Sequence, residues 1–366
     1  MNRAMLTTGA VVLLSLLPGS GGGEVVRGPV LHASTDGSMT ISWDTSENVI
    51  GELLYGLAEP DESAVESSPG THHVITLHGL EPDSLYRYRI AGEAGTAIGG
   101  TFRAGRAGSR FAFTVAGDTR SRPFFHRVVL DRVLALRPDL HINTGDLVES
   151  GEEAVEWDIF FRVEKDLLRH VPFLPVIGNH DKDENTFYDS LWCLPGVRDN
   201  PIFFSLRFAN ALFLVLDYEE ISDGSSAQDL WVVEQLERAA SDPQIEHIFP
   251  SYHVPPLSSG PHGNAANVHM LGWLHQAFKE AGVKLVFNGH DHTYERSLYD
   301  GIYYIVAGGG GAPQKGIMSH APPYPQERSQ VFTFEFSFIL VEVDGPRLEM
   351  SAFNMDNDRI DRIEVP

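Results

Sequence analysis

The stretch Lys284-Leu-Val-Phe-Asn-Gly-His-Asp-His292 joins a run of apolar residues to a cluster of imidazole and carboxylate side chains. The apolar run is typical of a buried strand, and the polar cluster follows at its carboxyl end. In open α/β sheets, ligands bind beside the carboxyl ends of strands. Because one residue separates His290 from His292, their side chains lie on the same side of an extended segment and can offer two imidazoles to adjacent metal ions.

Four earlier segments repeat this arrangement of an apolar run followed by polar residues. They end in Gly117-Asp118, Gly145-Asp146, Gly178-Asn179-His180-Asp181 and Tyr252-His253. Taken singly, a Gly-Asp pair after a strand is typical of a turn or a helix cap. Together, the segments bring two carboxylates, one amide and three or four imidazoles to strand ends. This is the ligand inventory of a two-metal hydrolytic centre.

This order of motifs resembles the calcineurin-like metallophosphoesterases, and the resemblance covers about residues 108–355. Two stretches resemble the purple acid phosphatase branch in particular, namely His253-Val-Pro-Pro-Leu-Ser-Ser-Gly-Pro-His262 and Gly289-His-Asp-His-Thr-Tyr-Glu-Arg296. The resemblance implies an α/β domain over residues 108–366, built from two stacked β-sheets flanked by helices. It also implies a hydrolase that acts on phosphate esters.

The resemblance further implies a role for each metal-binding residue. Asp118 and His292 would bind a first ion, Asp146 would bridge, and the second ion would be bound by Asn179, His253 and His290. Two ions per chain are implied, with Fe, Mn or Zn as candidates. A hydroxide between them would be the nucleophile, because metal binding lowers the pKa of water from 15.7 to about 7.

Three further residues are candidates for contact with the substrate. By resemblance, His180 would stabilise phosphate oxygens and His262 would contact the substrate or protonate the leaving alkoxide. Either imidazole could instead support a metal ligand from outside the metal centre. Arg120 could bind a phosphate with two parallel N–H groups, or it could form an ordinary surface salt bridge.

The chain departs from its relatives at the first ion. Purple acid phosphatases use a Tyr three residues after the bridging Asp, where this chain has Glu149. Most other metallophosphoesterases use a His two residues after the first Asp, where this chain has Arg120. The first ion therefore lacks a known ligand. We expect His126, near the start of the next helix, to supply an imidazole, with the carboxylate of Glu149 as the alternative.

Residues 25–105 show short period-two patterns separated by turn signals, at 38–43, 51–55, 73–77, 85–90 and 100–102. The patterns predict a small antiparallel β-sandwich. This region resembles the fibronectin type III-like domain that precedes the catalytic domain of purple acid phosphatases. We expect Trp43 and Tyr86 to be core anchors, because large aromatic rings contribute most when buried.

The remainder of the chain alternates strands with amphipathic helices. The apolar spacing predicts helices near 123–136, 152–168, 228–240 and 268–281. Residues 203–208 and 212–216 form a predicted hairpin around Ala209-Asn210. Later strands at 302–306, 332–343 and 348–353 predict the second sheet.

Composition and the N-terminus limit where the protein acts. The chain has 366 residues and a formal net charge of -23, which opposes binding to the phosphate backbone of nucleic acid polymers. At the N-terminus, Arg3 precedes an apolar run that ends at Pro18. This pattern is typical of a signal peptide, here over residues 1–24, and is too short for a comfortable membrane span. We therefore expect an exported protein without a stable membrane anchor.

The leading hypothesis is an exported phosphoesterase with two metal ions that hydrolyses small phosphomonoesters. A second hypothesis is a phosphodiesterase or nucleotide pyrophosphatase on the same centre, because the metal ligands alone do not select the leaving group. A third is a non-catalytic protein whose β-sandwich binds carbohydrate or a cell-wall partner and whose metal site is degenerate. The intact ligand set from Asp118 to His292 opposes the third hypothesis.

Overall fold

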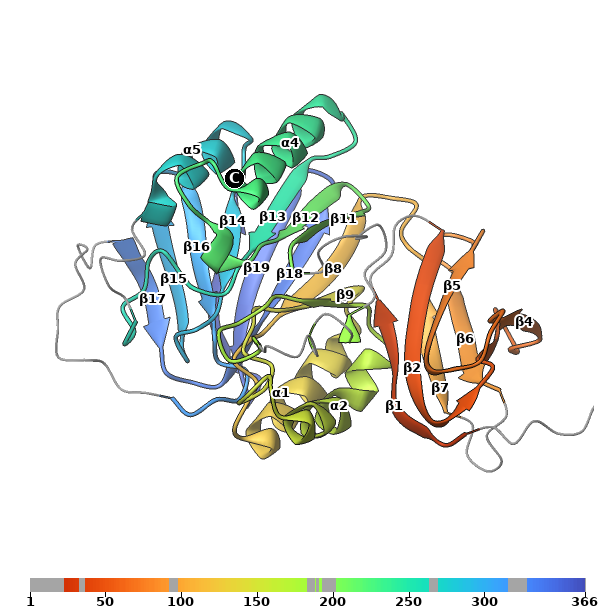
Figure 1. Ribbon diagram of the computed structural model, residues 1–366. Helices are drawn as coiled ribbons and strands as arrows, with labels where there is room; N and C mark the ends of the chain where they lie inside the picture. The colour runs from red at the N-terminus through yellow and green to blue at the C-terminus, as the bar shows by residue number, and fades with distance from the viewer. Residues whose placement is uncertain are drawn as a thin grey trace, which may run out of the picture.

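The computed structural model describes residues 23–32, 37–91, 98–182, 188, 191–192, 202–262, 269–314 and 328–365. Its strands form three sheets, and helices cover the two larger ones (Figure 1). Almost all of the predicted signal peptide lies outside the described residues. Among the helices within these ranges, none is long and apolar enough to cross a membrane.

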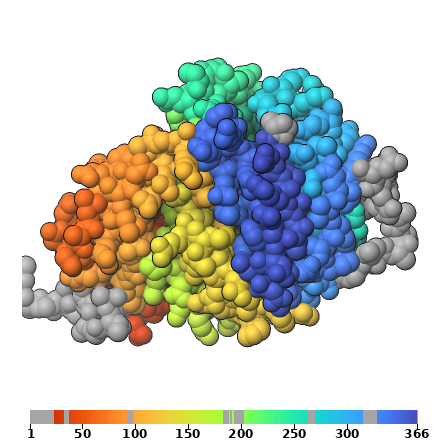
Figure 2. Space-filling view, turned by 180° about the vertical axis from the view of Figure 1, so that it is seen from behind, coloured from red at the N-terminus to blue at the C-terminus, as the bar shows by residue number. Residues whose placement is uncertain are grey.

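The first large sheet has nine strands and mixes parallel with antiparallel pairs. Its order is β20 (Arg359–Val365), β19 (Arg347–Asn354), β18 (Ser337–Asp344), β8 (Arg110–Val115), β9 (Leu140–Asn143), β10 (Phe173–Pro175), β1 (Val25–His32), β2 (Ser38–Val49) and β5 (Gly70–His78). Strands β8, β9 and β10 are parallel neighbours, so their carboxyl ends meet at one edge. From behind, the blue C-terminal strands of this sheet lie beside the yellow and orange segments (Figure 2).

The second large sheet has seven strands. Its order is β11 (Phe204–Phe208), β12 (Ala211–Val215), β13 (His247–Ser251), β14 (Leu285–Asn288), β16 (Ile302–Ala307), β15 (Tyr294–Tyr299) and β17 (Ser329–Thr333). The predicted hairpin is confirmed, since β11 and β12 pair antiparallel with Phe208 opposite Ala211. Strands β12, β13 and β14 are parallel, which gathers a second set of carboxyl ends.

A cluster of aromatic rings joins the two large sheets. The ring of Phe113 on β8 has its centroid 5.1 Å from that of Phe213, 4.9 Å from that of Phe249 and 5.8 Å from that of Phe287. All of these contacts are edge-to-face, the geometry that aromatic rings prefer. Since β8 belongs to one sheet and the other three rings to the second, this cluster fixes the separation of the sheets.

Two helices lie outside each sheet (Figure 1). Helices α1 (Pro123–Leu136) and α2 (Ala154–Leu168) pack on the first sheet, and α4 (Ala227–Ser241) and α5 (Trp273–Glu280) pack on the second. A short 3-10 helix, η1 (Tyr218–Glu220), follows β12. The four helices predicted from the sequence are confirmed, although α5 begins later than expected. The prediction of two stacked sheets flanked by helices is also confirmed.

The N-terminal strands form a small sandwich that is not separate from the rest. Its second sheet has the order β4 (Glu62–Val65), β3 (Glu52–Gly56), β6 (Leu85–Ile90) and β7 (Gly99–Arg103). Its first sheet, β1-β2-β5, continues the nine-stranded sheet because His32 on β1 pairs with Phe173 on β10. Trp43 and Tyr86 are buried, as predicted, and the Tyr86 hydroxyl accepts a hydrogen bond from the backbone N–H of Glu81.

Two predictions about the later strands are wrong. Residues 332–343 do not form a single strand: β17 ends at Thr333 in the second sheet, and β18 begins at Ser337 in the first. Strand β19, also expected in the second sheet, pairs with β18 in the first. The alternation of apolar and polar residues continues through 332–337, so the pattern carries no mark of the point where the chain crosses between sheets.

Candidate metal centre

Each polar motif follows the carboxyl end of a strand, as the sequence predicts. Asp118, Asp146 and Asn179 follow β8, β9 and β10, while His253 follows β13 and His290 follows β14. Asp118 and Asp146 both have φ of 55°, and His290 has φ of 70°. These left-handed conformations are uncommon for residues other than glycine and are concentrated at functional sites.

The loops at this edge approach one another too closely for ordinary side chains. A Cβ added to Gly178 would lie 2.2 Å from the backbone nitrogen of Asp146, and one added to Gly145 would lie 2.5 Å from Nδ1 of His253. The glycines that precede the polar residues therefore allow the ligand-bearing loops to touch. This is a steric requirement that a lone Gly-Asp turn would not have.

Asp181 fixes the loop that carries Asp146. Its Oδ2 accepts hydrogen bonds from the backbone N–H groups of Asp146 and Gly178, both at 2.8 Å. Its Oδ1 accepts from Leu147 at 2.7 Å and from Val148 at 3.1 Å. The sequence motif contains Asp181, but its position two residues after the candidate ligand Asn179 gave no sign that its side chain turns toward the backbone.

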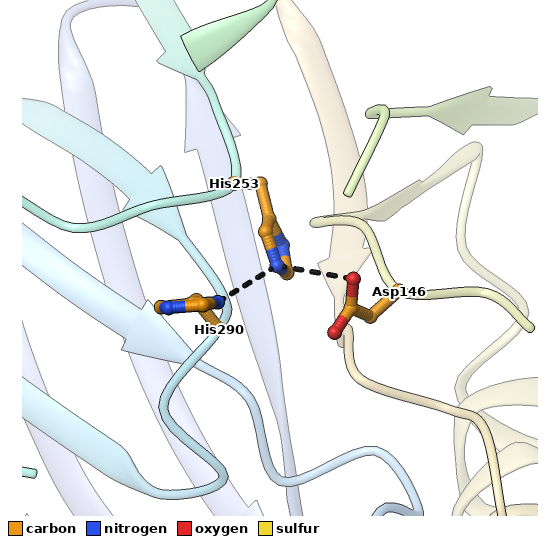
Figure 3. Close-up of side chains that lie close together, drawn as sticks. All are labelled: Asp146, His253 and His290. Atoms are coloured by element: carbon orange, nitrogen blue, oxygen red, sulfur yellow. Dashed lines mark hydrogen bonds and ion pairs between the residues drawn. The ribbon is translucent and has the colours of Figure 1, made fainter. Parts of the chain in front are cut away.

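Four ligand atoms from four loops converge at one point, which we call the second-ion group: Asp146, Asn179, His253 and His290. The Nε2 atom of His253 lies 3.2 Å from Oδ1 of Asp146, from Oδ1 of Asn179 and from Nδ1 of His290. Figure 3 shows three of these side chains pointing toward one another from separate loops. Nδ1 of His253 donates to the carbonyl of Thr144 at 2.8 Å, which makes Nε2 the nitrogen that can bind an ion once it has lost its proton.

These spacings fit a transition-metal ion. Ligand atoms about 2.1 Å from an ion stand roughly 3.0 to 3.4 Å from their neighbours in octahedral or tetrahedral coordination. The observed separations of 3.2 Å lie within that interval. Nitrogen and oxygen donors of this kind suit Fe, Mn or Zn.

A second set of ligand atoms, the first-ion group, consists of Asp118, Asp146 and His292. Their ligand atoms lie within 4.8 Å of one another, and Oδ1 of Asp118 is 3.5 Å from Nε2 of His292. Oδ1 of Asp118 is buried and has no hydrogen-bond partner among the described residues. A buried carboxylate oxygen without a donor is destabilising unless positive charge lies close to it.

Burial and mutual repulsion set the charges of this centre. Burial raises the pKa of Asp118 well above its usual range, and the neighbouring charge of Asp146 adds to the rise. Burial also opposes ionisation of Asp146, but the charge of His253 and the hydrogen bonds from His253 and from the backbone of His180 together outweigh it and hold the pKa of Asp146 well below its usual range. Burial lowers the pKa of His253, whereas Asp146 raises it, and the result is about 9. An ion at Nε2 must therefore displace a proton.

The expectation that His126 completes the first-ion group is wrong. Its Nδ1 lies 2.9 Å from the carbonyl oxygen of Gly310, and its Nε2 lies 2.9 Å from Oε1 of Glu164. Both ring nitrogens are therefore engaged with partners outside the first-ion group. Glu164 lies on α2, and its pairing with a residue of α1 could not be read from the local sequence.

Arg120 is not at the protein surface. Its guanidinium lies against two members of the first-ion group. Its Nε donates to Oδ2 of Asp146 at 3.2 Å, Nη1 donates to Oε2 of Glu149 at 2.8 Å, and Nη2 lies 3.4 Å from Nε2 of His292. The fork of N–H groups expected to bind phosphate is thus already in use. The alternative carboxylate, Glu149, is paired with Arg120. The first-ion group as it stands does not fit a fully coordinated ion.

His262 and His180 lie at the rim of the centre. The ring centroid of His262 is 4.2 Å from that of His290, and its Nδ1 is 2.7 Å from Oδ1 of Asp291. Asp291 is fully buried and also accepts from the hydroxyl of Ser258. His180 donates from Nδ1 to the carbonyl of Glu149 at 2.8 Å, and its Nε2 lies 4.0 Å from Oδ2 of Asp146. The sequence did not indicate that Asp291 pairs with His262, because the residues on either side of Asp291 in the motif are the metal-binding candidates.

A family comparison agrees with this geometry. The model of the calcineurin-like phosphoesterases matches residues 111–294, just over half of the chain. The chain belongs to the calcineurin-like phosphoesterase family. The prediction made from the order of the motifs is confirmed, and the chain is a hydrolase of the metallophosphoesterase class. This family depends on a dinuclear metal centre and acts on phosphate esters.

The similar proteins include purple acid phosphatases. Purple acid phosphatase 18 of Arabidopsis thaliana is 26% identical over 311 residues, covering 78% of this chain and 68% of that protein. The structure of the purple acid phosphatase PPD1 from yellow lupin superposes with a TM-score of 0.77 at 17% identity, covering 94% of this chain and 74% of that one. The structure of PhoD gives a TM-score of 0.67 at 11% identity, covering 96% and 94%.

Removing a member of the second-ion group should remove an ion from this phosphoesterase. We expect Asp146→Asn and His253→Ala to lower the metal content per chain and to abolish phosphate-ester hydrolysis, because each removes a ligand atom from the converging set. Elemental analysis of purified protein measures the first effect. His78→Ala, an exposed position on β5, is the matched control and should change neither quantity. Full metal content with full activity in His253→Ala would contradict the assignment.

Proposed function

We propose that this calcineurin-like phosphoesterase is an exported, metal-dependent phosphatase that hydrolyses small phosphomonoesters. The observation that carries the proposal is the convergence of Asp146, Asn179 and His290 on Nε2 of His253, each at 3.2 Å. An ion held there would supply a Lewis acid for the phosphate oxygens and a water of lowered pKa. Fe, Mn and Zn are the candidates.

His262 has the geometry of a proton donor to the leaving group. Because Nδ1 donates to Asp291 at 2.7 Å, the carboxylate holds the ring in one orientation and fixes the tautomer. The opposite nitrogen, Nε2, can then carry the proton that the departing alkoxide needs. The distance of 4.2 Å between the ring centroids of His262 and His290 supports a proton donor beside the second-ion group.

His180 contributes to the other side of the proposed phosphate site. Its backbone N–H donates to Oδ1 of Asp146 at 3.0 Å, and its ring is held by the carbonyl of Glu149. The side chain remains 31% exposed, so its Nε2 edge is accessible to a small ligand. We propose that this edge donates to a phosphate oxygen.

The second-ion group is open to solvent on one side, so a small substrate can reach it. Asn179 is exposed while His253 is fully buried, so the second-ion group has one open side. The net charge of -23 opposes nucleic acid polymers as substrates. We expect loops beside the centre, such as residues 182–200, to set the size of the leaving group, but most of these residues lie outside the described ranges.

Two model substrates test the reaction class. Metal-loaded protein should hydrolyse p-nitrophenyl phosphate faster than bis-p-nitrophenyl phosphate, because the proposed site binds a terminal phosphate. Initial rates of p-nitrophenolate release measure both. Faster turnover of the diester would favour the phosphodiesterase alternative. Turnover of neither substrate would favour the non-catalytic alternative.

The proton donor can be tested by changing the leaving group. We expect His262→Ala to lower kcat for an alkyl phosphate by about 10²- to 10⁴-fold with the metal content unchanged. The loss should be much smaller for p-nitrophenyl phosphate, whose leaving group needs little protonation. Asp291→Asn should show the same selectivity with a loss of about 10- to 100-fold, as expected for a residue that positions another. Equal losses on both substrates would indicate a structural role instead.

Export is a separate part of the proposal and has its own measurement. It is supported by Arg3 and the apolar run before Pro18. Mass spectrometry of the protein isolated from its native host should find a new N-terminus near residue 24 in a periplasmic or secreted fraction. An intact Met1 in a cytoplasmic fraction would contradict export. The fibronectin type III-like assignment of residues 25–105 and the boundary near 105–108 likewise remain predictions.

A further inference from the structure

The two ion groups differ in how their ligand atoms are used. In the second-ion group, the ligand atoms face one another across 3.2 Å, and no arginine or lysine side chain is bonded to Asn179 or His290 among the described residues. In the first-ion group, a guanidinium is already bonded to the atoms that would bind an ion. This asymmetry is a property of the chain's own residues.

Arg120 occupies two of the three ligand atoms of the first-ion group. Its Nε lies 3.2 Å from Oδ2 of Asp146, the oxygen that faces away from the second-ion group. Its Nη2 lies 3.4 Å from Nε2 of His292. Since Nδ1 of His292 donates to the carbonyl of Pro313 at 2.6 Å, Nε2 is the nitrogen with the lone pair, and Arg120 is its donor.

The guanidinium is anchored in this position. Glu149 accepts from Nη1 at 2.8 Å, and the hydroxyl of Ser121 donates to the same Glu149 oxygen. Arg120 is 9% exposed and Asp146 only 1%. An ion bound to Asp146 Oδ2 and His292 Nε2 would have to displace both hydrogen bonds and would stand beside a cation that does not lose its charge.

We propose that Arg120 is a built-in cation that takes the place of the first metal ion, so that each chain holds one ion tightly, in the second-ion group. The fixed charge of Arg120 neutralises Asp146 on the side away from that ion. Of the first-ion ligand atoms, Oδ1 of Asp118 alone has no hydrogen-bond partner among the described residues, and a single carboxylate oxygen holds an ion weakly. Any part played by Arg120 in hydrolysis rests on the proposed function, whereas the number of ions does not.

The counting of ions is the direct test. Metal-free protein is loaded with Mn²⁺, passed through a desalting column, and analysed for manganese per chain. We expect one ion in the wild type and one in Asp118→Asn, because Asp118 belongs to the group that Arg120 replaces. We expect two in Arg120→His, which removes the guanidinium and adds an imidazole at the same position. Arg127→His, a partly exposed position on α1, is the matched control and should keep one ion.

Electron paramagnetic resonance of the same samples gives a readout that is independent of turnover. The wild type should show the signal of isolated Mn²⁺, and Arg120→His should show the signal of a spin-coupled pair. Arg120→Lys retains a cation and should keep the isolated signal, so it separates the effect of charge from that of a disturbed fold. Two tightly held, coupled ions in the wild type would overturn the inference, as would a single isolated ion in well-folded Arg120→His.

The outcomes distinguish this inference from the proposed function. A protein that binds one ion but hydrolyses no phosphate ester refutes the proposed function alone. An active phosphatase with two tightly held ions in the wild type refutes the role of Arg120 alone.

Discussion

The centre depends on the charge of Asp146, which is almost fully buried between two cations or cation sites. One carboxylate oxygen faces His253 at 3.2 Å, and the other accepts from Arg120 at 3.2 Å. A buried carboxylate is strongly destabilising unless opposite charge and hydrogen bonds surround it. Asp181 holds the backbone of the Asp146 loop, and Gly178 lets the next loop approach it. The loops around Asp146 are thus arranged to satisfy one negative charge.

The sheets determine which residues can reach that charge. Parallel strands β8, β9 and β10 end at one edge of the first sheet, and β12, β13 and β14 end at the facing edge of the second. Phe113 packs against three aromatic rings of the opposite sheet and sets the distance between these edges. Interiors packed in this way change little in volume. The metal-binding side chains can therefore be carried on loops and still meet with spacings of 3.2 Å.

Local patterns predicted much of this arrangement. Helix α1 begins and ends where its apolar spacing and Pro123 indicate, and each polar motif lies at a strand end. Contacts between distant segments were not predictable in the same way. The pairing of His32 with Phe173, which joins the N-terminal strands to the larger sheet, leaves no periodic mark in either segment. His126 was predicted to be a metal ligand because its actual partner, Glu164, lies on another helix and could not be recognised from the local sequence.

The guanidinium of an arginine cannot supply all of the chemistry that a metal ion supplies to the centre. A guanidinium carries one positive charge, donates only along its N–H bonds, and does not coordinate water, so it does not lower the pKa of water as an ion does. If Arg120 replaces an ion, activation of water falls to the second-ion group, and Arg120 contributes only electrostatic stabilisation. Its charge is permanent and does not depend on metal supply. Such a centre would lose the activating ion to a chelator but would retain the single positive charge of Arg120 beside Asp146. Glu149 and Ser121 then serve to anchor the guanidinium and do not form part of a second ligand set.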